Sequence, residues 1–275
     1  MKKTLFVSLI FLFLNASESL AQDEKYNSIS LNWGYGNIMR QDKSFSPMIH
    51  KKSSPINLLL EYNRSKNTEQ QAYIKFGLYK PLVGEGFTFH YHDGKKESTY
   101  PHSFYLVDIN YALGKNILEK GKWKLALGGK VRNRLMASDY IFGNAGSFGY
   151  YFTFGLNAWT KINFDLNEKH HFVSHVTLPL LSFNARSPYN SQNDQYFIDS
   201  YSHKPFKTFN QYIKGGELQS WGKSQSFDFD VSYYYTLSEK WEIGGKYLLS
   251  MDFNQNPTKF AQLENVFYLS GKLKF

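Results

Sequence analysis

The chain has 275 residues and no cysteine, carries a formal net charge of +9 at pH 7, and is 18% aromatic, with 21 Tyr and 24 Phe. The lack of cysteine excludes disulfides and a cysteine-anchored lipoprotein. Mean hydropathy is −0.47, and beyond the N-terminal segment no apolar run approaches the roughly 20 residues of a membrane-spanning helix. A helical membrane protein is therefore excluded.

The N-terminal segment predicts export. Met1 and two lysines precede an apolar run from Leu5 to Leu14, and Ser19-Leu20-Ala21 supplies a small-x-small cleavage site. This order is typical of a secretory signal peptide. We expect a signal peptide over 1–21 and a mature chain over 22–275. The excess of basic residues suits contact with anionic headgroups or acidic sugars, although scattered lysines also solvate turns and loops.

Ten stretches of the mature chain alternate apolar and polar residues with the period of a β-strand. In chain order they cover 28–35, 56–62, 72–79, about 103–113, 123–132, about 148–164, 172–180, 227–235, 241–251 and the terminal stretch that ends at Phe275. The pattern predicts an all-β protein in which every strand has one apolar and one polar face.

The connections between these stretches alternate long and short. The long ones are 36–55, 80–102, 133–147, 181–226 and 252–264, and the short ones are 63–71, 114–122, 165–171 and 236–240. Outer-membrane barrels have short periplasmic turns and longer external loops. We therefore expect a transmembrane antiparallel up-and-down β-barrel of about 10 strands, with both termini on the periplasmic side. Twelve strands is the rival count, because residues 195–201 also alternate.

Aromatic residues lie where a membrane-interface girdle is expected. Trp123 and Trp241 each follow a short connection, and Phe275 ends the chain; aromatic rings favour that boundary. The terminal alternation resembles the C-terminal signature of outer-membrane β-barrel proteins, and the residues that carry it are Phe267, Leu269, Gly271, Leu273 and Phe275. The resemblance implies a place in the outer membrane, contact with its lipid, and recognition by the outer-membrane insertion machinery during biogenesis.

The composition adds a finer resemblance. The Ala21-Gln22 junction and the Tyr- and Lys-rich mature chain are similar to barrels from Bacteroidota. Because eight strands leave an interior that side chains fill, and 16 to 18 leave an aqueous channel, about ten strands indicate a narrow or plugged lumen. Large-solute porin activity is not expected.

Charged residues on the polar strand faces are candidates for a network inside the lumen. Lys130, Arg132 and Arg134 follow one another on one strand, and Asp228 and Asp230 face inward from another. Opposite charges at these positions predict ion pairs that plug the lumen. The alternative is a polar constriction or a binding site for a small charged solute.

Two histidines of an external connection, His90 and His92, are candidates for a site at the rim of the barrel. A histidine beside the acidic pair Asp228 and Asp230 can activate water, an arrangement similar to that of omptin proteases, which also have ten strands. The resemblance is partial, because no acidic pair lies on an early strand. No catalytic residue, metal site or cofactor is assigned, and no nucleic-acid signature is present.

The longest connection, 181–226, carries Arg186, the aromatic residues of 196–201, and Trp221. Such residues can stack on sugars or contact a protein partner, and the connection can also fold inward as a cap. The sequence thus predicts an outer-membrane barrel that serves envelope transport or acts as a surface-interaction or complex subunit. A rim enzyme, a protease or a lipid-modifying hydrolase, is the alternative.

Overall fold

The structure, a computed structural model, describes residues 26–66, 68–80, 87–99, 102–142, 145–187, 210–211 and 213–275. The predicted signal peptide and the alternating segment 195–201 lie outside the described residues. Among the described residues, no helix is both long enough and apolar enough to cross a membrane.

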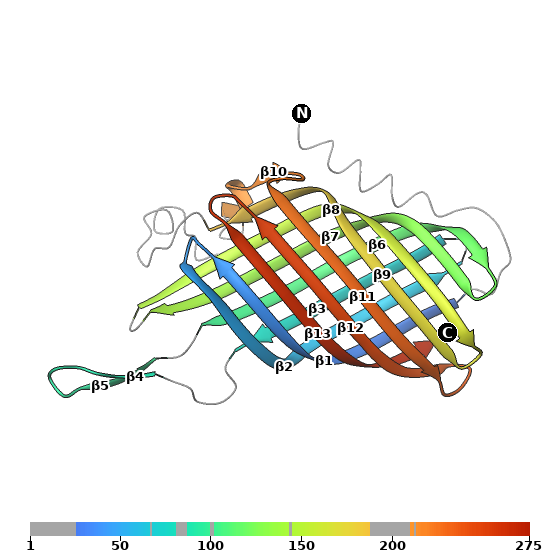
Figure 1. Ribbon diagram of the computed structural model, residues 1–275, viewed down its shortest axis with the longest axis horizontal. Helices are drawn as coiled ribbons and strands as arrows, with labels where there is room; N and C mark the ends of the chain where they lie inside the picture. Colours follow the sequence, from blue (N-terminus) through green and yellow to red (C-terminus); the bar gives the residue numbers. More distant parts are fainter. Residues whose placement is uncertain are drawn as a thin grey trace.

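Ten antiparallel strands close into a barrel (Figure 1). They are β1 (Tyr26–Asp42), β2 (Ser46–Ser65), β3 (Thr68–Tyr79), β6 (Ser103–Lys120), β7 (Trp123–Phe142), β8 (Ala145–Asn167), β9 (His170–Arg186), β11 (Ser224–Thr236), β12 (Trp241–Asn254) and β13 (Phe260–Lys274). Each strand pairs with the next in this series, and β13 pairs with β1 to close the sheet. The expected all-β, ten-stranded barrel is confirmed, and the described residues add no further pair to the barrel wall.

Three short strands lie outside the ten. β4 (Phe87–His90) and β5 (Lys96–Thr99) form a separate hairpin, which projects away from the barrel in Figure 1. β10 (Glu217–Gln219) pairs with β9 through Leu218 and Phe183 and extends the wall beyond the end of β11. The long connections after β3 and β9 therefore carry the additional structure.

The expected strand boundaries are wrong at the ends. The predicted loops 36–55 and 133–147 are mostly strand, because β1 and β2 are joined by 43–45 alone and β7 runs to Phe142. The short connections are also shorter than predicted. The one after β6 consists of Gly121 and Lys122 alone, and Gly121 has a φ of +59°. At the loop end the inner face carries buried apolar side chains such as Ile38 and Met136, and the outer face carries polar ones such as Asn37, so these strand ends lack the pattern of apolar outside and polar inside that reveals the middle.

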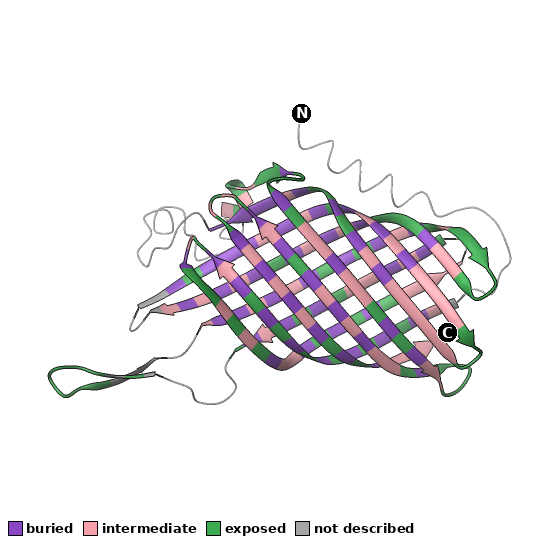
Figure 2. Cartoon of the chain, in the orientation of Figure 1, coloured by how far each residue is buried: buried purple, intermediate pink, exposed green. Residues whose placement is uncertain are grey.

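Buried and exposed residues alternate along most of each barrel strand (Figure 2), with interruptions at β-bulges such as the one near Leu181. On β1, Leu31 and Trp33 are 63% and 60% exposed on the outer surface, whereas Ser30 and Asn32 are fully buried inside. Along the middle of the other strands the outward residues are mostly apolar and most of the inward ones polar, apart from the buried apolar clusters inside the barrel. A polar interior under an apolar exterior suits a barrel in lipid, where closure also leaves no unpaired strand edge.

The two ends of the barrel differ, and we call them the terminal end and the loop end. The terminal end carries Tyr26, the first described residue, the C-terminal Phe275, and the short connections that follow β2, β6, β8 and β11. There Phe275 and Asn27 exchange two backbone hydrogen bonds of 2.9 and 3.1 Å, and Trp123 and Trp241 are each 52% exposed on the outer surface. The loop end carries the other five connections.

Candidate functional site

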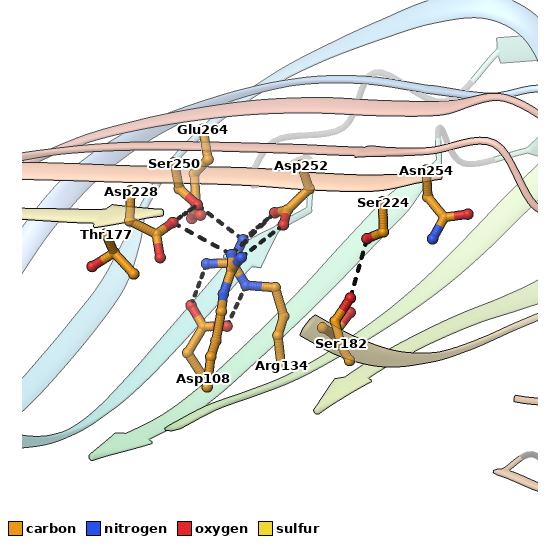
Figure 3. A network of polar contacts seen from close by, with 12 residues as sticks. Asp108, Arg134, Thr177, Ser182, Ser224, Asp228, Ser250, Asp252, Asn254 and Glu264 are labelled. Atoms are coloured by element: carbon orange, nitrogen blue, oxygen red, sulfur yellow. Dashed lines mark hydrogen bonds and ion pairs between the residues drawn. The ribbon is translucent and has the colours of Figure 1, made fainter. Parts of the chain in front are cut away.

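A network of ion pairs, which we call the charged belt, crosses the lumen (Figure 3). It comprises four cations and four carboxylates: Lys75, Lys130, Arg132, Arg134, Asp108, Asp228, Asp252 and Glu264. No side chain among them is more than 7% exposed. The belt is therefore formally neutral and closed to solvent.

Arg134 is the central residue of the belt. Its Nε and Nη2 donate to the two carboxylate oxygens of Asp108 at 2.5 and 2.8 Å, which is the bidentate geometry that favours arginine. Its Nη1 donates to Asp252 and, at 2.9 Å, to the hydroxyl of Ser250. Because β7 and β12 are separated by several strands along the sheet, these bonds join opposite walls.

The other members extend the network to both sides of Arg134. Arg132 lies 3.0 Å from Asp252 and 3.4 Å from Asp228, and Lys130 lies 3.7 Å from Asp228. On the opposite side, Lys75 bridges Asp108 at 3.3 Å and Glu264 at 2.5 Å. Four of the five predicted lumen residues, Lys130, Arg132, Arg134 and Asp228, thus meet in one network.

Asp230, the fifth predicted lumen residue, contacts other partners. Its carboxylate accepts from Nδ1 of His175 at 2.9 Å and lies 3.3 Å from Nζ of Lys246, which also donates to Glu61 at 2.5 Å. Asp228 and Asp230 are two positions apart on the same inner face, but each faces a different set of cations. Asp230 therefore belongs to a second cluster on the terminal side of the belt.

On the loop side of the belt, apolar and aromatic side chains fill the lumen. This loop-end aromatic cluster consists of Ile38, Phe45, Tyr79, Phe104, Leu106, Met136, Tyr140, Tyr151 and Phe260. The rings of Phe45 and Tyr140 stack at 4.8 Å, and those of Tyr151 and Phe260 meet edge to face at 4.9 Å. Every member is at most 7% exposed, so the cluster forms a packed layer across this end.

Two arginines pack against this layer. The guanidinium of Arg40 lies 4.9 Å and that of Arg186 lies 5.1 Å from the ring centroid of Phe260, within the range of cation–π attraction. Arg186 also pairs with Asp42 at 2.9 Å. The expectation that Arg186 lies on an external loop is therefore wrong, because residues 181–186 continue β9 and turn its side chain inward. Trp221 is 59% exposed.

The predicted rim histidines lie elsewhere. His90 ends β4 and His92 follows in the turn of the β4–β5 hairpin, and both side chains are exposed. Asp228 and Asp230 are committed to cations inside the barrel. The described residues thus bring neither histidine to the acidic pair, and they contain no group of three or more His, Asp or Glu that could hold a metal ion.

Two other histidines, His50 and His102, meet at the loop end. Their rings lie 4.4 Å apart edge to face, and both contact Tyr140. Burial lowers the pKa of His102 to about 4, with further lowering by His50 and Lys52, and burial together with Lys52 and Arg40 lowers the pKa of His50. At this level of the barrel the outward residues Asn37 and Ser53 are polar, and the Ser53 hydroxyl donates a hydrogen bond to Asn37. The two histidines therefore lie beyond the apolar band of the outer surface.

We expect acid to loosen this end of the barrel. Nδ1 of His102 accepts a 2.8 Å hydrogen bond from the backbone N–H of Ile141, so a proton on Nδ1 removes the acceptor. Because the folded pKa is about 4 and the unfolded value is about 6.5, the unfolded state binds more protons between these values. The stability of the folded state therefore falls as pH drops from about 6.5 towards 4.

The measurement is the urea midpoint of the barrel in mild detergent at pH 7.5 and pH 5. Carboxylates contribute to acid sensitivity as well, so the comparison is with His50→Gln/His102→Gln, whose amides keep polar atoms but do not titrate. We expect a smaller drop in midpoint for the variant. An equal drop in both proteins would assign the acid sensitivity to other groups.

Some of these residues were not identified from the sequence. Glu264 has the inward parity of Tyr268, Ser270 and Lys272, and that signal could have placed it in the lumen. His50 falls in a segment without clear alternation, and no sequence signal pointed to its contact with His102.

The architecture defines the class of this chain as a ten-stranded barrel of the outer-membrane type. No family model matches the sequence, and no curated protein matches it. Among solved structures, the outer membrane protease OmpT from Escherichia coli has a TM-score of 0.51 with 9% identity, over 94% of this chain and 99% of that one. At that identity the likeness shows a shared fold.

Two further barrels are similar at lower scores. The translocator domain of autotransporter NalP from Neisseria meningitidis has a TM-score of 0.39 at 8% identity, covering 100% of this chain and 95% of that one. Neisserial surface protein A has a TM-score of 0.35 at 8% identity, covering 90% and 97%.

Proposed function

We propose that this chain is an exported outer-membrane barrel that is closed to solute flow and acts through its external end, as a surface-interaction protein or a subunit of an envelope complex. The observation that carries the proposal is that side chains fill the lumen at its middle and at its loop end. The charged belt joins opposite walls, and the loop-end aromatic cluster packs across the same passage. A solute would have to displace both layers to cross.

The external end supplies surface for contact in this proposal. The β4–β5 hairpin extends beyond the barrel in Figure 1, and His90, Tyr91 and His92 are exposed on it. Exposed aromatic and imidazole groups on a projecting hairpin suit a protein or glycan partner. The terminal end would face the periplasm, and the strand ending at Phe275 would be the element read by the insertion machinery.

The test is single-channel recording of the purified barrel in a planar bilayer at neutral pH. We expect no discrete conductance steps from the wild type or from Asp228→Asn/Asp230→Asn, because both keep the large side chains that fill the lumen. Steps in the wild type, with an ion selectivity that changes in the variant, would show an open lumen lined by these carboxylates and would overturn the proposal.

A separate experiment tests whether the β4–β5 hairpin contacts a partner. Replacement of 87–99 by a Gly-Ser linker should leave the heat-dependent gel shift of the barrel unchanged and remove proteins that co-purify with the wild type from cross-linked outer membranes. Retention of the same proteins by the variant would exclude the hairpin as the contact.

A further inference from the structure

The terminal half of the lumen is hollow, in contrast to the loop half. A cavity of about 960 Å³ opens there, and no member of the charged belt lines it. The Lys246, Glu61 and His175 cluster lies on its wall, on the side toward the belt. The volume is in the range of sites for small molecules, and the lining is dominated by charged and polar side chains.

Several buried polar atoms on this wall lack hydrogen-bond partners among the described residues, and two of them bear on the ligand. Oγ of Ser28, on β1, and Nε2 of His175, on β9, are unbonded, and the two residues are 0% and 5% exposed. Buried polar atoms are paired in the great majority of cases. Because the two strands lie on different parts of the barrel wall, a molecule inside the cavity could meet both.

The hydrogen bonding of His175 determines which ligand group its free ring nitrogen can bind. The carboxylate of Asp230 can only accept, so Nδ1 of His175 carries the proton of their 2.9 Å bond. In the neutral ring Nε2 is then an acceptor. The ring stacks on Trp159 at 5.7 Å, which holds its orientation. Nε2 therefore suits a hydroxyl donor, and the Ser28 hydroxyl can donate in return.

The charges at the cavity favour an anion. Seven lysines and four carboxylates line it, and even with Glu69 and Asp230, which pair with lining lysines, the lysines remain in excess. Lys272 and Lys274 share one carboxylate, that of Glu242. Lys115 has no ion pair within the described part of the chain. Because residues two apart on a strand share a face, Lys272 and Lys274 lie side by side on the wall of the cavity, where both could contact one anionic group.

We infer that the terminal-end cavity binds a small anion that bears hydroxyl groups, such as a uronic acid or a sugar phosphate, entering from the side of the short turns. The anionic group contacts Lys272 and Lys274, one hydroxyl donates to Nε2 of His175, and an oxygen accepts from Ser28. This site is independent of the proposed external contact, because it lies at the opposite end of the barrel.

The test is calorimetric titration of the mature barrel in non-ionic detergent at pH 7 with four probes: glucose 6-phosphate, glucuronate, glucose and inorganic phosphate. We expect the first two to bind at least about tenfold more tightly than the last two, since each of the last two lacks one of the required features. Tighter binding of glucose 6-phosphate than of glucuronate would show that the anionic group of the ligand is a phosphate. The reverse order would show that it is a carboxylate. No binding of either anion, or equal binding of glucose, would overturn the inference.

Two variants locate the site. Ser28→Ala removes a hydroxyl with no described partner, so the fold should persist while affinity falls about threefold to tenfold, the value of one hydrogen bond. Lys272→Gln/Lys274→Gln should erase the preference for anions over glucose. The control is His170→Gln, an exposed ring bonded to Tyr233, which should bind as the wild type does. Unchanged affinity in Ser28→Ala, with its gel shift intact, would contradict the assignment.

Discussion

Leu269→Arg should lower the free energy of unfolding of the barrel in phospholipid vesicles by about 2–4 kcal/mol. Leu269 is 72% exposed on the outer face of β13, between the outward residues Phe267 and Gly271. It precedes the terminal Phe275 by six residues, which at about 3.4 Å per residue and a strand tilt near 40° places it close to the middle of an apolar band about 25 Å tall. An arginine there must lose hydration or distort the bilayer.

The matched control is Leu218→Arg. Leu218 is 67% exposed, nearly as much as Leu269, but it lies on β10 beside Phe183, at the loop end of β9. A surface substitution in water usually changes stability by about 0.5 kcal/mol or less. The measurement is urea unfolding followed by tryptophan fluorescence and by the gel shift on boiling. Equal losses at the two leucines would mean that exposure to lipid does not distinguish them, and the barrel would not span a bilayer at β13.

The direction in which each strand side chain points could be predicted because the period of a strand is two. Lipid on one side and a narrow lumen on the other maintain that alternation except at the β-bulges. Arg132, Arg134 and Asp228 were placed inside on parity alone, and all are buried. The outward positions of Trp123 and Trp241 followed from the same parity and from the short turns before them.

Strand ends could not be predicted to the same extent. In the first half of β2, exposed Met48 and Ile49 are adjacent, and Lys51 and Ser53 face outward where an apolar residue would be expected in lipid. Beyond the hydrocarbon layer the outer face meets water, so the apolar outer residues that mark a strand in lipid are no longer selected. The strand persists there through backbone pairing with β1, which leaves no trace in the pattern of hydropathy.

The ion-pair partners also could not be derived from the sequence. Parity shows that Lys75 and Glu264 face inward, but their 2.5 Å contact joins residues 189 positions apart. It depends on the stagger of the strands around the whole barrel. An error of two residues in register keeps every side chain on its face and changes every partner, which is why Asp230 was grouped with the cations that Asp228 contacts.

Arg134→Leu should lower the free energy of unfolding by about 3–5 kcal/mol, because it leaves the buried carboxylates of Asp108 and Asp252 short of a cation. Arg134→Lys should lose less, since the charge stays and the bidentate fork is lost. The control is Lys124→Leu, which breaks a 2.6 Å pair with Glu119 at the surface and should cost about 1 kcal/mol or less. Urea midpoints in detergent provide the comparison.

The decisive variant combines Arg134→Leu with Asp108→Leu. If the large loss in Arg134→Leu reflects an unpaired buried carboxylate, removal of Asp108 restores the balance of charges, and Lys75 keeps its partner Glu264. The double variant should then recover about half or more of the lost stability, as expected when a whole buried pair is replaced by apolar side chains. Losses that simply add would show that the two side chains contribute independently, and the belt would then be a set of separate contacts instead of one charge-balanced layer across the lumen.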